Sequence, residues 1–154
     1  MIYLDYNATT PIDEVVGQAM LPYITRHFGN PSSNHEFGQI AKTAVEKARG
    51  QAAALLNAHP DEIYFTSGGS ESNNTAIKGL AWHDKKPGQH IITSQTEHPA
   101  VLNVCAWLQT QGFDITYLPV DSEGLVNPAD LEAAMCDKTI LVSIMHANNE
   151  TGTI

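Results

Sequence analysis

The stretch His90–Thr110, HIITSQTEHPAVLNVCAWLQT, joins a short β-branched run to a segment with apolar residues at helical spacing. Pro99 stands at the first turn of the predicted helix, where its missing N–H does no harm. The same order of strand, polar turn and helix recurs on both sides of this stretch. Such alternation is typical of a mostly parallel sheet with helices on both faces. The sequence therefore predicts an α/β fold.

The other elements follow from apolar spacing and from breaks at Gly, Asn and Pro. Ser33 is the expected N-cap of the second helix, with Glu36 completing a capping box. Residues 85–88 (KKPG) are expected to form a surface loop within the domain. We expect helices over residues 13–27, 34–56, 70–82, 99–110 and 128–135, and strands over residues 62–66, 90–94, 114–120 and 139–145.

The last predicted strand, residues 139–145 (TILVSIM), is apolar enough to be buried on both faces. Such a strand needs covering helices and neighbouring strands, yet only nine residues follow Met145. We therefore expect either a fragment of a larger domain or a domain that another chain completes. An unpaired sheet edge should also make the isolated chain self-associate or dissolve poorly.

Composition argues against several classes of protein. The formal net charge is −9, from 8 Lys and Arg against 17 Asp and Glu, and no basic cluster marks a nucleic-acid footprint. The apolar runs are too short to span a bilayer, and the N-terminus has no basic segment of a secretory signal. Cys105 and Cys136 have no metal spacing, and each lies in an apolar helical pattern, so we expect structural roles in a reducing compartment. We expect a cytoplasmic protein.

Three polar clusters follow predicted strands: residues 67–73 (SGGSESN), 96–98 (TEH) and 146–150 (HANNE). In open α/β sheets, ligands bind outside the carboxyl ends of the strands. The first cluster suits an anion, the second offers an imidazole and the third offers amides. Together they suggest a phosphorylated, flat, polar cofactor.

The first cluster has the chemistry of an anion site. Gly68 and Gly69 let the backbone come close to a ligand, and the N–H groups that follow lie at the positive end of a helix. Ser70 adds a hydroxyl donor. The lysine of the Walker pattern is missing, which disfavours a nucleoside triphosphate. An ordinary helix cap would have a similar sequence, so the loop alone leaves both interpretations open.

The other two clusters also allow two interpretations each. His98 can stack on a ring or transfer a proton, or it can be a surface histidine. Asn148 and Asn149 can hold a ligand hydroxyl, or they can stabilise a turn. The histidines and cysteines form no metal-binding motif, so we predict no metal site.

Five segments occur in an order that resembles one family over essentially the whole chain. They are residues 3–11 (YLDYNATTP), 29–33 (GNPSS), 66–74 (TSGGSESNN), 96–98 (TEH) and 146–152 (HANNETG). Together they resemble the cysteine desulfurases of the NifS/IscS type, which are class-V aminotransferase-family enzymes that depend on pyridoxal 5'-phosphate (PLP). The resemblance implies the aspartate-aminotransferase fold. Residues 1–12 would be an N-terminal segment on the small-domain side, and residues 13–154 the truncated N-terminal part of the PLP-binding large domain.

The resemblance also implies roles for individual residues. Gly69 and Ser70 would bind the cofactor phosphate, His98 would stack on the pyridine ring and act as an acid–base catalyst, and Asn149 would hydrogen-bond the ring hydroxyl. Family members often have Thr where Ser70 stands, which keeps the hydroxyl. The residues nearest the substrate would be Asn7, Ala8, Thr9 and Asn30.

The family's reaction needs three further groups that match nothing here. They are a lysine that holds PLP covalently, an aspartate at the pyridine nitrogen, and a mobile cysteine that takes up the substrate's sulfur. The lysines lie away from the strand-end clusters, and neither Cys105 nor Cys136 matches the mobile cysteine. The resemblance implies a homodimeric parent that converts L-cysteine to L-alanine and passes sulfur to an iron–sulfur scaffold protein. We expect this chain alone to be inactive.

Three alternatives remain open from the sequence. The first is another class-V PLP enzyme, such as a selenocysteine lyase or an aminotransferase. The second is a non-catalytic piece that a partner chain completes. The third is a phosphate-binding module unrelated to PLP, in which Ser70 would matter and His98 would not.

Overall fold

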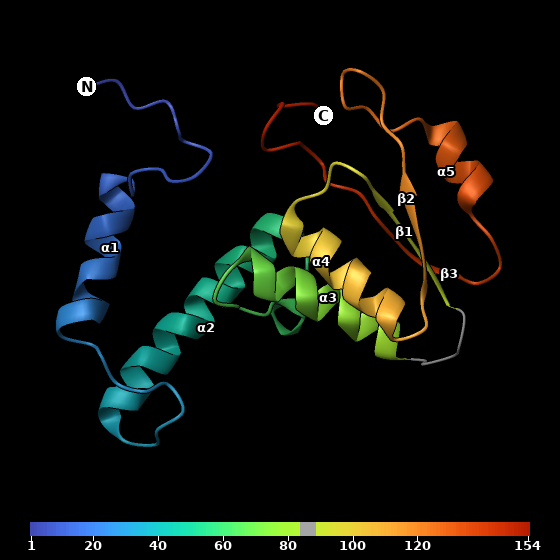
Figure 1. The fold of residues 1–154 in the computed structure, drawn as a ribbon. Helices are drawn as coiled ribbons and strands as arrows, with labels where there is room; N and C mark the ends of the chain where they lie inside the picture. Colours follow the sequence, from blue (N-terminus) through green and yellow to red (C-terminus); the bar gives the residue numbers. More distant parts are fainter. Residues whose placement is uncertain (84–88) are drawn as a thin grey trace. The chain divides into compact units, whose positions relative to one another are not determined.

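The computed structural model describes residues 1–83 and 89–154, so the predicted surface loop at residues 85–88 lies outside the described residues. The chain forms two compact units, Met1–Phe65 and Thr66–Ile154. Figure 1 shows the helices and strands of each unit along the sequence. Among the described residues, no helix has the length and apolar character needed to cross a membrane.

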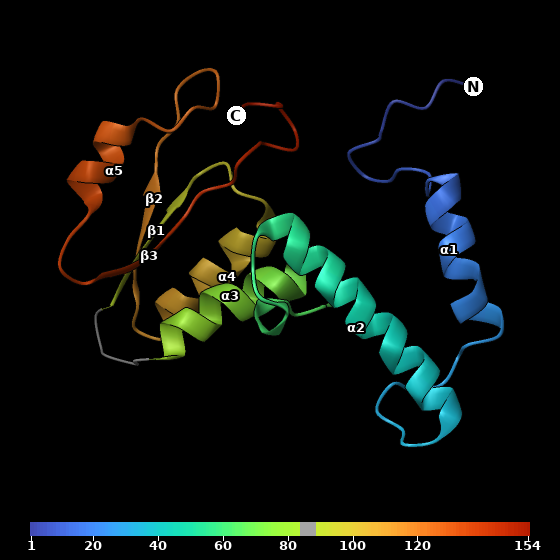
Figure 2. The same cartoon turned by 180° about the vertical axis from the view of Figure 1, so that it is seen from behind.

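The second unit is built on a parallel sheet. Its described strands are β1 (His90–Ser94), β2 (Asp114–Leu118) and β3 (Thr139–Ser143), in the order β2-β1-β3. Its helices are α3 (Gly69–His83), α4 (Pro99–Thr110) and α5 (Pro128–Ala134). Figures 1 and 2 show α3 and α4 side by side on one face of the sheet and α5 on the other. The predicted α/β fold with a parallel sheet is confirmed.

The core of the second unit lies between β1 and the helix pair. Ile91 of β1 and Leu108 of α4 are fully buried, and Ile77 of α3 is nearly so. Trp82 closes one end of this core, with its ring 5.1 Å from that of Trp107. Burying a large aliphatic side chain contributes about 1.5–3 kcal/mol, so these contacts fix α3 and α4 against the sheet.

The first unit consists mainly of two helices, α1 (Glu14–Thr25) and α2 (Glu36–Leu56), followed by the short 3₁₀ helix η1 (Pro60–Glu62). Asp13 caps α1 by accepting a hydrogen bond from the N–H of Val15 at 2.9 Å. Asn57 ends α2 in the left-handed conformation, with φ 52°, as the predicted break there required.

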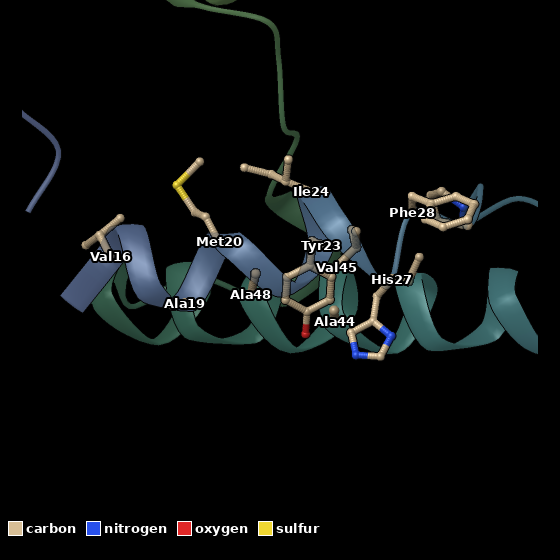
Figure 3. Close-up of a pocket in the computed structure, with 13 residues that line it drawn as sticks. Val16, Ala19, Met20, Tyr23, Ile24, His27, Phe28, Ala44, Val45 and Ala48 are labelled. Atoms are coloured by element: carbon tan, nitrogen blue, oxygen red, sulfur yellow. The ribbon is translucent and has the colours of Figure 1, made fainter. Parts of the chain in front are cut away.

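The first unit has an apolar groove between α1 and α2, shown in Figure 3. Val16, Met20 and Ile24 line it from α1, and Ala44, Val45 and Ala48 line it from α2. Its volume is about 680 Å³. None of the predicted cofactor residues lines this groove.

The predicted N-cap at Ser33 is wrong. The cap of α2 is His35, whose Nδ1 accepts a hydrogen bond from the N–H of Gly38 at 3.3 Å. Ser33 instead belongs to the preceding turn, where its N–H donates to the carbonyl of Asn30 at 2.9 Å. That turn packs onto Gly38, where an added Cβ would stand 2.3 Å from the carbonyl oxygen of Ser33.

The predicted strand over residues 62–66 is also wrong. Glu62 ends η1, and its carboxylate accepts a hydrogen bond from the N–H of His59 at 2.7 Å, which completes a capping box. Ile63 that follows is extended, with φ −97° and ψ 122°, but residues 63–66 pair with no strand among the described residues. An extended backbone becomes a strand only when a neighbour supplies the ladder hydrogen bonds.

The prediction that the last strand is buried on both faces is wrong for the described structure. β3 is an edge strand that pairs with β1 alone, and its side chains are half-buried or exposed. The apolar sequence of residues 139–145 is nevertheless of the kind found in central parallel strands.

Candidate functional site

The loops that follow β1 and β3 meet at the carboxyl ends of the two strands. The two strands are parallel, with Thr93 opposite Ser143, so their carboxyl ends lie together. The carboxylate Oε1 of Glu97 accepts a hydrogen bond from the N–H of Met145 at 2.5 Å. The side-chain amide of Asn148 donates to the carbonyl of Thr96 at 3.0 Å. The structure therefore joins the second and third polar clusters directly.

Glu97 is the residue of this site that the sequence analysis missed. It is 6% exposed, and the same Oε1 also accepts a hydrogen bond from the hydroxyl of Ser94 at 3.4 Å. A buried carboxylate is stable only when it has such partners. The signal for it in the sequence is its place directly before His98, in the first turn after a strand.

His98 caps α4, and this role sets its tautomer. The Nδ1 atom accepts a hydrogen bond from the N–H of Ala100 at 3.0 Å. A neutral imidazole has one acceptor nitrogen and one donor nitrogen, so Nε2 carries the proton. The ring is exposed to solvent and held at its base by the helix that Pro99 opens. Its Nε2–H can therefore meet a ligand without breaking the cap.

The loop at the start of α3 is braced by its own side chains. The carboxylate of Glu71 accepts hydrogen bonds from the N–H of Ser67 at 2.7 Å and from its hydroxyl at 2.6 Å. The hydroxyls of Thr66 and Ser72 lie 2.6 Å apart. The Ser67 hydroxyl, and then its N–H, hold the pKa of Glu71 below its usual range. These hydrogen bonds within residues 66–72 hold the first turn of α3.

Gly69 and the glycine before it stand in open space. A Cβ built on Gly68 or Gly69 meets no atom within 4 Å, so no packing among the described residues of the second unit explains these glycines. Neither has a positive φ that would require glycine. Ser70 is exposed beside them in the first turn of α3, where helix N–H groups have no partner within the helix. Room next to a helix N-terminus and a hydroxyl fits a phosphate group.

The structure gives the two asparagines different surroundings. Asn148 holds the turn: its Oδ1 accepts hydrogen bonds from the N–H groups of Glu150 at 2.8 Å and of Thr151 at 2.9 Å. Asn149 is exposed, and its side-chain amide donates to the carboxylate of Glu150 at 3.2 Å. The turn-stabilising role therefore belongs to Asn148, which leaves Asn149 as the residue able to face a ligand.

The predicted substrate-side residues belong to the first unit and are described within it alone. Thr9 lies 2.6 Å from the hydroxyl of Tyr3, and Ala8 donates its N–H to the carbonyl of Asp5 at 3.1 Å. Asn7 lies in the same turn. Asn30 accepts a hydrogen bond from the N–H of Ser32 through its side chain at 2.9 Å.

Within the described residues of the second unit, the lysines and cysteines lie away from the site. Lys78 of α3 stands over the ring of Trp107, 4.4 Å from its centroid, while Lys85 and Lys86 fall outside the described residues. Cys105 is buried in the core of the second unit, as predicted. Cys136 is exposed just after α5, so its expected place inside a helix is wrong. The helix α5 ends before Cys136 because the backbone of its C-cap residue, Met135, is extended.

Comparison with known proteins agrees with the resemblance. The family model of the class-V aminotransferases matches residues 2–154. The chain is 58% identical over 153 residues to the cysteine desulfurase IscS of Methanosarcina thermophila, which covers 99% of this chain and 38% of that protein. The chain thus spans about 38% of the length of the curated relative it matches.

Solved structures agree in both fold and sequence. A structure described as a NifS-like protein superposes with a TM-score of 0.92 at 43% identity, over 97% of this chain and 41% of that chain. A structure of SspA in complex with cysteine gives a TM-score of 0.90 at 44% identity, over 96% of this chain and 43% of that chain.

The second unit is thus a parallel α/β unit in which α3 begins beside two glycines and an imidazole follows a strand end. The chain belongs to the class-V aminotransferase family, whose cysteine desulfurases depend on PLP.

Proposed function

We propose that this chain is the N-terminal part of a cysteine desulfurase that converts L-cysteine to L-alanine and retains the sulfur on an enzyme cysteine. One observation supports this most strongly. The hydrogen bonds of Glu97 and Asn148 join the two strand-end clusters that carry His98 and Asn149. The identity of 58% to a cysteine desulfurase over nearly the whole chain supports the same activity.

PLP would be held by residues that the second unit already arranges. Gly69 and Ser70 would bind its phosphate at the start of α3, His98 would stack on its ring, and Asn149 would hydrogen-bond its ring hydroxyl. When bound, PLP acts as an electron sink for the bonds at the substrate's α-carbon. The protein's part is to orient the cofactor and to place donors and acceptors around it.

His98 would both orient the ring and move a proton. With Nδ1 accepting from the N–H of Ala100, Nε2–H can only donate a hydrogen bond to a ligand, and to take up a proton at Nε2 the ring would first have to change tautomer and give up the cap bond. The rigid cap keeps that atom at one place relative to the start of α4. Glu97 would act indirectly, because its hydrogen bond to the backbone N–H of Met145 fixes the position of the loop that carries Asn149.

Further features of the function rest on the relatives. Asn7, Ala8, Thr9 and Asn30 would lie near L-cysteine. We propose a cytoplasmic homodimer that passes its sulfur to an iron–sulfur scaffold protein. The covalent lysine, the pyridine-nitrogen aspartate and the sulfur-accepting cysteine match none of the 154 residues, so the reaction would need residues besides these.

The test is a product assay on the protein as its gene encodes it. The purified protein with PLP, L-cysteine and a thiol reductant should release L-alanine and sulfide in equal amounts. L-selenocysteine and amino-group acceptors serve as competing substrates. Preference for L-selenocysteine, or transfer of the amino group to a keto acid, would replace the proposal with another class-V activity.

A further inference from the structure

A second cluster of reactive side chains lies at the amino ends of the strands, whereas the candidate site lies at their carboxyl ends. His90 and Thr139 are the first residues of β1 and β3, whereas the candidate site follows the last residues of these strands. Cys136 reaches the amino ends from the turn after α5. We call Cys136, His90, Thr139 and Thr116 the thiol cluster.

The thiol cluster has the geometry of an activated nucleophile. The Sγ of Cys136 lies 3.7 Å from the Nδ1 of His90, and the other ring nitrogen of His90 lies 2.8 Å from the hydroxyl of Thr116. His90 is 7% exposed, so its ring is held between the strands. A nucleophile within hydrogen-bond reach of an imidazole that a third group orients is the arrangement that activates cysteine.

Thr139 adds a donor to the sulfur. Its hydroxyl oxygen accepts a hydrogen bond from the N–H of Cys136 at 2.9 Å, and its own O–H can donate to the Sγ, 3.6 Å away. The Nδ1 of His90 lies 2.9 Å from the same hydroxyl, so the three groups form one network. Hydrogen bonds from Thr139, and then from the N–H of Lys138, lower the pKa of the Cys136 thiol.

The other cysteine of the chain has the opposite surroundings. Cys105 is fully buried, and burial, followed by the charge of Glu97, raises the pKa of its thiol. Cys136 is exposed to solvent. The thiolate is the nucleophilic form of cysteine, so exposure and donors favour reaction at Cys136 and disfavour it at Cys105.

We propose that Cys136 is a reversible modification site that exchanges with small disulfides. The Sγ thiolate attacks one sulfur of the disulfide, the old S–S bond breaks, and the departing thiolate leaves with the electron pair and takes a proton from solvent. Cys136 is left as a mixed disulfide, and a free thiol reverses the step. Exchange needs only a thiolate and access, which the thiol cluster provides. The proposal stands apart from the PLP site and does not rest on it.

The test measures modification at each cysteine of the protein as its gene encodes it, with glutathione disulfide as the probe and mass spectrometry as the readout. The reference is a synthetic peptide of residues 132–140 (EAAMCDKTI), which has the local sequence without His90 or the fold. For each unit by which the pKa of a thiol falls, the thiolate fraction rises about tenfold while the nucleophilicity of the thiolate falls about threefold, so the net rate increases. We therefore expect Cys136 at pH 7 to react faster in the protein than in the peptide. Cys105 should stay unmodified in the native state.

Variants separate the cluster from simple exposure. Thr139→Val keeps a β-branched residue but removes the hydroxyl, and it should move the midpoint of the rate–pH profile up toward that of the peptide. Thr116→Val should have a smaller effect in the same direction. Thr110→Val makes the same chemical change on α4 and should leave the profile unchanged. A wild-type rate and midpoint equal to those of the peptide would overturn the proposal, even if Thr139→Val failed to fold.

Discussion

Glu97 should stabilise the junction of the two strand ends by several kcal/mol. In Glu97→Ala, the N–H of Met145 loses an acceptor at 2.5 Å and the hydroxyl of Ser94 loses one at 3.4 Å. A buried donor left without a partner costs about 1–3 kcal/mol, and the bonds of a charged acceptor contribute more than neutral ones. We expect Glu97→Ala to lower the free energy of unfolding by about 3 kcal/mol. Glu97→Gln keeps a carbonyl oxygen for Met145 and should cost about 1 kcal/mol.

The assay is urea denaturation of the protein as its gene encodes it, followed by circular dichroism, with the slope of unfolding compared between variants. Glu132→Ala, an exposed carboxylate on α5, is the matched control and should stay within about 0.5 kcal/mol of wild type. If Glu97→Ala were as stable as Glu132→Ala, the bond across 48 residues would not hold the loops together, and the reasoning about these strand ends would fail.

Three further predictions follow from the same geometry. Ser67→Ala should raise the pKa of Glu71, measured by NMR titration, because it removes the hydroxyl that lowers it. In wild type the lowered pKa of Glu71 contributes to stability above its unfolded-state pKa, and this contribution is lost as the pH falls through the folded-state pKa. In Ser67→Ala the free energy of unfolding should therefore change less with pH across that acidic range. His98→Asn keeps a good N-cap for α4 but removes the imidazole, so thermal stability should stay near wild type while L-alanine release falls at least about a hundredfold; His98→Ala should also lose about 1 kcal/mol of stability. A polypeptide that ends at Ile154 should release no L-alanine above a protein-free blank, and release with added PLP would show that a catalytic lysine had been overlooked.

Local signals predicted part of the fold well. β1 and α4 occupy the predicted ranges because β-branched residues and an opening Pro99 mark them without help from distant residues. The prediction of a strand over residues 62–66 failed because a strand needs a neighbouring strand to pair with. The sequence of one segment does not say whether that neighbour is present. The prediction of Ser33 as the N-cap of α2 failed because Ser33 belongs to the turn in which its N–H donates to the carbonyl of Asn30. The observed cap, His35, lies only two residues further on.

The candidate site was predictable in its residues but not in its connections. The strand-end positions of His98 and Asn149 follow from the pattern of strand, polar turn and helix. The roles of Glu97 and Asn148 do not, because their hydrogen bonds cross 48 and 52 residues and depend on the register between β1 and β3. The exposure of Cys136 likewise depends on where α5 ends.

The most direct test of the account is a visible-absorbance titration of the protein, as its gene encodes it, with PLP. We predict a saturable spectral change, with affinity reduced at least about tenfold in Ser70→Ala, since one hydrogen bond to a charged phosphate contributes roughly 1.5 kcal/mol or more. Glu132→Ala should bind as wild type does. No spectral change, or equal affinity in Ser70→Ala and wild type, would contradict the assignment of the α3 start and the joined strand ends as a PLP site.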